Sequence, residues 1–140
     1  MIRKENIMSR SLIQTTNTTP AAVAVNGIIP LGSVLRRFGC NCRLNGNNIE
    51  VEGTGYYTVE GTVTVQPAAA GAVSVALFEN NVAVPSAVAT GTAAAIGDDV
   101  TLPISTTVRE TCCEGASSLA LVLTDGASTV TNVSLRVEKE

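Results

Sequence analysis

Apolar and polar residues alternate along most of the chain with a period of two, which is typical of half-buried β-strands. The clearest example is residues 55–65, where Tyr57 and three valines point to one side and Tyr56, threonines and a glutamate point to the other. Tyrosine, valine and threonine favour pleated, half-covered surfaces, and the glycines before this stretch favour a turn or bulge. We therefore predict that residues 55–65 form a central strand.

Turn signals separate further alternating segments. Asn80-Asn81 and Asp125-Gly126 each follow such a segment, and these residue types accept the positive φ angles of tight turns. Pro103 has no amide hydrogen, so we expect its strand at a sheet edge or at a bulge. Because no segment indicates a helix, the pattern predicts an all-β fold, an antiparallel jelly-roll sandwich of about eight to ten short strands.

The composition favours self-association. The 140 residues suit one domain, and apolar residues make up 45% of the chain while charged residues make up only 15%. Residues 119–123 are apolar on both faces of their predicted strand, so one face is expected to be covered by a neighbour. Side chains that alternation places opposite the core form the predicted contact surface between copies. These are Tyr56, Phe78, Ala120 and Val122.

Charge and residue content exclude several functions. The net charge of −3 argues against nucleic-acid binding, which needs clustered basic residues, and the only basic cluster is Arg36, Arg37 and Arg43, read as solvated loop charges. The chain has no histidine, the commonest general base and zinc ligand. The carboxylate pairs Glu50/Glu52 and Asp98-Asp99 are interpreted as surface and turn charges. We therefore predict no enzymatic activity, catalytic residue, metal or cofactor.

The cysteines are the one group of soft ligands. Cys40 and Cys42 lie in one predicted turn, and Cys112 and Cys113 lie in another. A disulfide between the two turns is the hypothesis for an oxidising exterior, and free thiols are expected in a cytoplasm. A four-cysteine zinc site is the third alternative, but the spacing lacks the Cys-x-x-Cys arrangement that suits tetrahedral coordination.

The first part of the chain differs from the remainder. Residues 1–20 are polar and rich in threonine and asparagine, so we predict a flexible arm before a head domain of residues 21–140. Charges interrupt every apolar run near the N-terminus, and no segment approaches membrane-spanning length. We therefore expect synthesis in a cytoplasm without a secretory signal, and no membrane partner.

Residues 49–51, 55–59 and 133–137 resemble the jelly roll shared by complement globular heads and tumour-necrosis-factor-like proteins. Residues 23–32 and the neighbourhoods of the cysteines are similar to phage head-fibre or decoration proteins and to the heads of exosporium collagen-like proteins. The resemblance spans residues 21–137 and implies a homotrimer around a threefold axis. The chain lacks a Gly-X-Y collagen repeat, which favours a particle-anchored protein over a filament tip.

For function, the resemblance implies a structural virion protein on the capsid surface, a homotrimeric head fibre or capsid decoration. The arm would bind the major capsid protein or another virion protein, with Ile7, Leu12 and Ile13 as its apolar contacts. One alternative is a trimeric head on a spore surface. Another is a module that binds host carbohydrate or a host surface protein through its loops, although tryptophan is absent. A small hydrolase is a further alternative, but the chain has no nucleophile motif.

Overall fold

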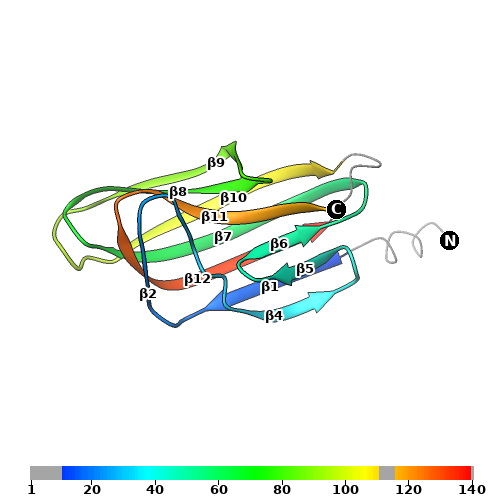
Figure 1. The fold of residues 1–140 in the computed structure, drawn as a ribbon, viewed down its shortest axis with the longest axis horizontal. Helices are drawn as coiled ribbons and strands as arrows, with labels where there is room; N and C mark the ends of the chain where they lie inside the picture. Colours follow the sequence, from blue (N-terminus) through cyan, green and yellow to red (C-terminus); the bar gives the residue numbers. More distant parts are fainter. Residues whose placement is uncertain (1–10, 111–115, 140) are drawn as a thin grey trace.

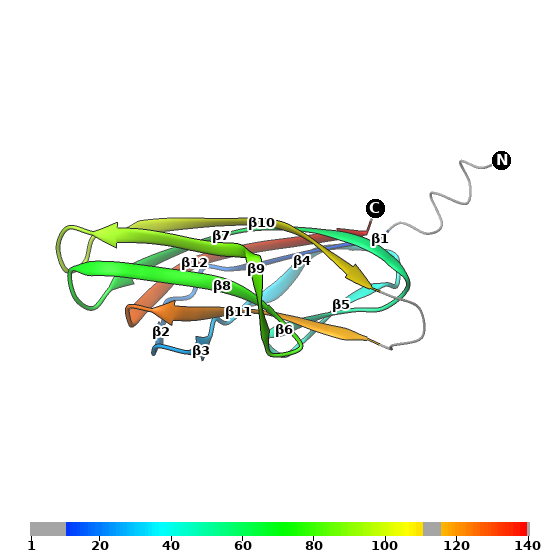
Figure 2. The same ribbon diagram turned by 90° about the horizontal axis from the view of Figure 1, so that it is seen from above.

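The computed structural model describes residues 11–110 and 116–139, which form two antiparallel sheets packed face to face (Figures 1 and 2). Sheet A has the strand order β10-β7-β12-β1-β4, with β2 also paired to β12. Sheet B has the order β5-β6-β11-β8-β9, with β3 also paired to β11. The strands are β1 (Ser11–Asn17), β2 (Ala21–Val23), β3 (Gly27–Ile28), β4 (Ser33–Phe38), β5 (Cys42–Asn45), β6 (Asn48–Val51), β7 (Gly55–Pro67), β8 (Gly71–Glu79), β9 (Val82–Ala93), β10 (Val100–Glu110), β11 (Ser117–Asp125) and β12 (Ser128–Lys139).

The core lies between the two sheets, and strand β7 shows how the alternation fills it. β7 pairs with β10 on one side and with β12 on the other, so it is an interior strand, as predicted. Tyr57, Val59 and Val63 are fully buried, whereas Tyr56 is 53% exposed. From the facing sheet, Leu121 and Leu77 are directly opposite each other in register and equally buried. The predicted all-β sandwich is therefore confirmed.

The edge strands follow the sequence signals. β10, which contains Pro103, is the end strand of sheet A, as the missing amide hydrogen predicted. β9 is the end strand of sheet B and lies beside β10, where the Ser86 and Thr106 hydroxyl oxygens are 2.6 Å apart. The two sheets therefore close along this side. The predicted turns also form, with positive φ angles at Asn80, Asn81 and Gly126.

The sandwich has more and longer strands than the sequence pattern suggested. The described residues contain twelve strands, more than the expected eight to ten, and β7, β9, β10 and β12 have 11 to 13 residues each. Residues 87–93, which are rich in alanine, threonine and glycine, belong to β9, the end strand of sheet B, because this segment pairs with β8. Within residues 11–110 and 116–139, no helix is long and apolar enough to cross a membrane.

The predicted boundary between arm and head at residue 20 is wrong. Ser11–Asn17 is strand β1, which pairs with β12 on one side and β4 on the other. Ile13 belongs to the core and Leu12 is part of the same strand, so neither belongs to a free arm. Backbone hydrogen bonds on both sides hold a segment whose polar composition suggested disorder. Ile7 lies outside the described residues.

A small polar cluster closes one end of the sandwich around Tyr57. The Tyr57 hydroxyl donates to the carbonyl oxygens of Glu52 and Gly53, at 3.0 and 2.8 Å. Asn41 bridges the same end, since its side-chain amide donates to the Glu52 carbonyl oxygen at 2.6 Å. Burial raises the pKa of Tyr57 to about 12, with the negative charges of Cys42 and Glu110 as lesser causes.

Tyr57→Phe is expected to lower the free energy of unfolding by about 0.5–1.5 kcal/mol, because the hydrogen bonds of the buried Tyr57 side chain to the Glu52 and Gly53 carbonyl oxygens are lost. The adjacent and exposed Tyr56 provides the matched control, and Tyr56→Phe is expected to change it by less than about 0.5 kcal/mol. Urea denaturation of both variants measures the difference. Equal stabilities of the two variants would contradict the anchoring role of the Tyr57 hydroxyl.

The same pair of variants predicts a pH dependence. The folded state favours the neutral phenol of Tyr57, so its contribution is complete below about pH 10, the pKa of an unfolded tyrosine. This contribution is lost as the pH rises towards the folded-state pKa of about 12. Between these values the wild-type protein should lose more stability than Tyr57→Phe, as followed by urea denaturation at each pH.

Candidate functional site

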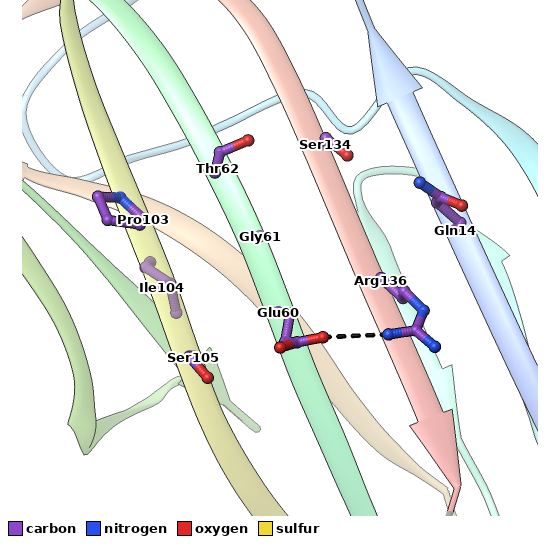
Figure 3. A pocket seen from close by; sticks show the side chains of 9 residues that line it. All are labelled: Gln14, Glu60, Gly61, Thr62, Pro103, Ile104, Ser105, Ser134 and Arg136. Carbon is purple, nitrogen blue, oxygen red and sulfur yellow. Dashed lines mark hydrogen bonds and ion pairs between the residues drawn. The ribbon is translucent and has the colours of Figure 1, made fainter.

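The outer face of sheet A carries short polar side chains around a shallow hollow of about 370 Å³ (Figure 3). Strands β1, β7, β10 and β12 each supply part of its lining. Gly61 lies in its middle, and a Cβ atom there would approach the Leu135 Cδ1 atom to 2.8 Å, so glycine makes room for a core leucine. The lining residues are Gln14, Glu60, Gly61, Thr62, Pro103, Ile104, Ser105, Ser134 and Arg136.

One guanidinium group organises the charges of this hollow. Arg136 donates from Nη1 to Glu60 Oε1 at 3.0 Å and from Nη2 to Glu138 Oε1 at 2.7 Å, and Figure 3 shows the first of these contacts. The Arg136 side chain is 40% exposed, so solvent screens the pairs and each is worth at most about 1 kcal/mol. The lining offers hydroxyl, carboxamide, carboxylate and guanidinium groups as hydrogen-bonding partners, and it contains no histidine or lysine.

Strand β4 forms an exposed edge beside this face. All six of its residues are exposed, although β4 is paired with β1 along one side, and its other side has no partner among the described strands. Val34, Leu35 and Phe38 are 41%, 54% and 55% exposed, and we call these three residues the β4 patch. An exposed edge strand with large apolar side chains is the kind of surface that another chain covers.

The register places part of the β4 patch on the outer face of sheet A. Phe38 is opposite Leu12, and Leu12 is opposite Glu138, whose side chain bonds Arg136 on that face. Directly opposite residues in an antiparallel sheet point to the same side. Tyr56 shares this face, with the Arg109 guanidinium 5.8 Å from its ring centre. The outer face of sheet A therefore combines a polar centre with aromatic groups near one end.

The four residues predicted to form one contact surface lie on opposite faces of the sandwich. Tyr56 is on β7 of sheet A, whereas Phe78 is on β8 and Ala120 and Val122 are on β11 of sheet B. A contact between copies through all four residues would therefore involve both faces of the sandwich, and their role at an interface stays a prediction. Alternation shows which side chains oppose the core, but it does not show to which of the two sheets a strand belongs.

Strand β11 is apolar on both faces, as predicted, but its outer face is largely covered within the chain. Ala120 is 8% exposed and Val122 is 7% exposed. Phe78 lies opposite Ala120 in register, and Ile28 of β3 lies opposite Val122. The short strand β3 is thus one of the neighbours that the sequence argument had attributed to another copy.

The structure brings Phe78, Ala120 and Val122 together in a second hollow, of about 350 Å³, on the outer face of sheet B. This hollow could not be predicted from the sequence, because two of its residues, Asn26 and Asn81, come from turns that are distant in sequence. The sequence contained one indication of these two residues, because asparagine is favoured in tight turns, and both asparagines adopt the positive φ angles of such turns. Ile28 completes the lining.

The acidic pairs behave as interpreted from the sequence. Glu50 forms an ion pair with Arg43 at 2.8 Å, and hydrogen bonds from Asn45 and Arg43 lower the pKa of Glu50. Asp98 and Asp99 accept hydrogen bonds beside their turn, from the Ala95 amide and the Gln66 side chain. Among the described residues, no group of three or more His, Cys, Asp or Glu side chains could hold a metal ion.

One buried carboxylate was not predicted. Glu110, the last residue of β10, is buried, and one of its oxygens accepts a hydrogen bond from the Ser117 hydroxyl at 2.5 Å. Its other oxygen has no hydrogen-bond partner within the described residues. Leu102, Ile104 and Val108 of β10 point inward, and the same alternation places residue 110 on the inward side. The sequence pattern therefore indicated that Glu110 is buried.

Two of the four cysteines can be placed. Cys40 is exposed and Cys42 is buried, and both are free in the structure. Burial raises the pKa of the Cys42 thiol to about 11, although the positive charges of Arg37 and Lys139 act in the opposite direction. Cys112 and Cys113 lie outside the described residues, so the crosslink between the two turns stays a prediction.

No protein-family model matches the chain, and no curated protein matches its sequence. Solved structures match its fold over most of its length. Murine APRIL covers 94% of this chain and 100% of its own, with 8% identity and a TM-score of 0.74. The globular domain of zebrafish complement 1qA covers 91% and 94%, with 4% identity and a TM-score of 0.67.

A third similar structure is the vertex protein P5 of PRD1, which covers 93% of this chain and 96% of its own, with 12% identity and a TM-score of 0.57. At such identities the likeness shows the fold alone. The chain therefore has the jelly-roll fold of TNF-like proteins and complement heads, as its sequence resemblance implied.

The different environments of Cys40 and Cys42 predict different rates of thiol labelling. In a Cys112→Ser/Cys113→Ser chain, a maleimide at pH 7 should label Cys40 rapidly and Cys42 only after unfolding, because only the deprotonated thiol reacts. Mass spectrometry of the labelled peptides measures both rates. Cys40→Ser in the same background should then show no rapid labelling, and fast reaction at Cys42 would contradict its burial.

Proposed function

We propose that this chain is the head domain of a homotrimeric structural protein on a virion surface, a head fibre or capsid decoration without enzymatic activity. The observation that carries the proposal is the β4 patch, three large apolar side chains that are 41–55% exposed on the edge strand of a TNF-like sandwich. The fold likeness to a vertex protein supports the setting on a particle.

The energetics of the β4 patch favour association. A medium-sized apolar side chain contributes about 1.5–3 kcal/mol when it moves from full exposure to full burial. The three side chains of the patch are roughly half exposed, so covering each of them contributes about half as much. Since a closed trimer forms three equivalent contacts, this contribution recurs at every interface.

The position of the β4 patch suits a ring of three copies. The patch lies at one edge of sheet A, and the polar hollow lies nearer the middle of the same sheet. An edge that docks on the face of the next copy makes a heterologous contact, and such contacts close into a ring when the rotation allows it. Tyr56 on the outer face is the member of the originally predicted interface that this arrangement retains.

The proposed anchoring role is confined to the first ten residues. Leu12 and Ile13 are part of β1, which leaves Ile7 as the apolar contact of the original prediction. We propose that this segment binds the major capsid protein or another virion protein. A spore surface is the alternative setting for the same trimeric head.

Sedimentation equilibrium of the full chain at micromolar concentration should give three times the monomer mass. Phe38→Glu and Leu35→Glu should shift the species to monomer, because a charge buried at the contact has no partner. Ile96→Glu is the matched control, since Ile96 is also exposed but lies in the loop after β9. A wild-type monomer, or equal effects of all three changes, would defeat the proposal.

The particle setting is tested separately by immunogold electron microscopy with an antibody against the head. Regularly spaced label on virions is expected, with none on spores, and label should fall several-fold when Ile7→Asp replaces the wild-type chain. Label on spores alone would favour the spore-surface alternative. Undiminished label on virions with Ile7→Asp would contradict anchoring through this residue.

A further inference from the structure

The hollow on the outer face of sheet B has an apolar floor with walls on two sides. Ala120 and Val122 form the floor, and Phe78 and Ile28 stand opposite them on the neighbouring strands β8 and β3. The small alanine side chain leaves depth between the larger residues. The resulting volume of about 350 Å³ is at the lower end of the range of about 300–1,000 Å³ for ligand sites.

Two turns hold polar groups at the rim of this hollow. The Asn26 amide donates to the Leu123 carbonyl oxygen at 2.6 Å, which fixes one turn on β11. The Asn80 amide donates to the Ser118 carbonyl oxygen at 2.8 Å, and the Asn80 side chain accepts from the Ser118 amide, which fixes the other turn. The rim is therefore anchored at both ends of the apolar floor.

The rim carboxamides are available to a ligand. Asn26 and Asn81 both have φ angles of 69° and are exposed, and their side chains have no hydrogen-bond partner among the described residues. The Asn80 side chain, by contrast, already accepts a hydrogen bond from the Ser118 amide and donates one to the Ser117 hydroxyl. A carboxamide both donates and accepts hydrogen bonds, so each rim asparagine suits a hydroxyl group.

We propose that this hollow binds a neutral saccharide of one or two rings. None of the six lining residues is charged, so a charged ligand would lose hydration without gaining an ion pair. The ring of Phe78 and the aliphatic floor match the C–H face of a sugar ring, and the two carboxamides match its hydroxyls. The two turn anchors are five residues apart on β11, roughly 16 Å at 3.3 Å per residue, which limits the ligand length.

This site is independent of the proposed trimer contact. The β4 patch and Tyr56 belong to sheet A, whereas the hollow opens on the opposite face of the sandwich, on sheet B. A trimer joined through sheet A would leave one hollow open on each copy. Three open sites on one particle-bound head would bind a polymeric glycan more tightly than a single site does.

Titration of the full-length chain with glucose, N-acetylglucosamine and their β-linked dimers, followed by ¹⁵N NMR, tests the proposal. Shifts are expected at residues 118–123 and at both rim turns, and glucuronic acid should bind more weakly than glucose. No binding of any neutral sugar at tens of millimolar, or equal binding of glucuronic acid, would overturn the proposal.

Two substitutions separate this site from a general effect on folding. Phe78→Leu keeps an apolar wall but removes the ring, and Asn81→Gly removes a carboxamide while accepting the positive φ angle. Each should weaken binding about tenfold. Asn47→Gly, in the exposed turn between β5 and β6 of the same sheet, is the matched control and should leave affinity unchanged. Unchanged affinity in both site variants would overturn the assignment, and sedimentation of the same samples reports the trimer separately.

Discussion

The two sheets are held together by the packing of one face of sheet A against one face of sheet B, and this packing restricts every long strand. Valine, leucine and isoleucine supply nearly all of the core, and Tyr57 is its single large aromatic member. Such a core consists of many small contacts, each of which requires the correct alternation on its strand. A slip of one residue would expose an entire face, so the register of every long strand is fixed by the core.

The outer faces of the two sheets do not take part in this packing, and their side chains differ in polarity. Sheet A presents hydroxyls, carboxamides and the Arg136 ion pairs, with the apolar β4 patch at its edge. Sheet B presents a neutral hollow between two anchored turns. This division matches two separate roles, since an exposed apolar edge favours association and a neutral hollow favours a small ligand.

The similarity to APRIL, complement 1qA and the PRD1 vertex protein illustrates how little of this fold depends on particular residues. Identities between 4% and 12% are sufficient because any sequence that alternates and turns at compatible places can fill such a sandwich. Similarity of fold therefore does not show what this chain does. Assembly and ligand binding are proposed from the β4 patch and the hollow of sheet B, which are properties of this chain.

Local chemistry along the chain was sufficient to predict the class of fold, the inward face of β7, an edge or bulge position for Pro103 and the turns at Asn80-Asn81 and Asp125-Gly126. Each of these follows from local chemistry, either the two-residue period of a strand or the φ angle that a residue accepts. Which strands pair with each other could be seen only in the folded chain. The polar segment 11–17 became a strand because β12 and β4 satisfy its backbone on both sides.

The same limit explains what the sequence left open at the candidate sites. Tyr56 and Phe78 both oppose the core, but nothing local indicates that they lie on different sheets. Likewise, Ile28 lies beside Val122, and Asn26 and Asn81 line one hollow, only because segments far apart in sequence come together in the fold. Alternation specifies on which side of a strand a side chain lies, whereas only the packed sandwich decides what that side faces.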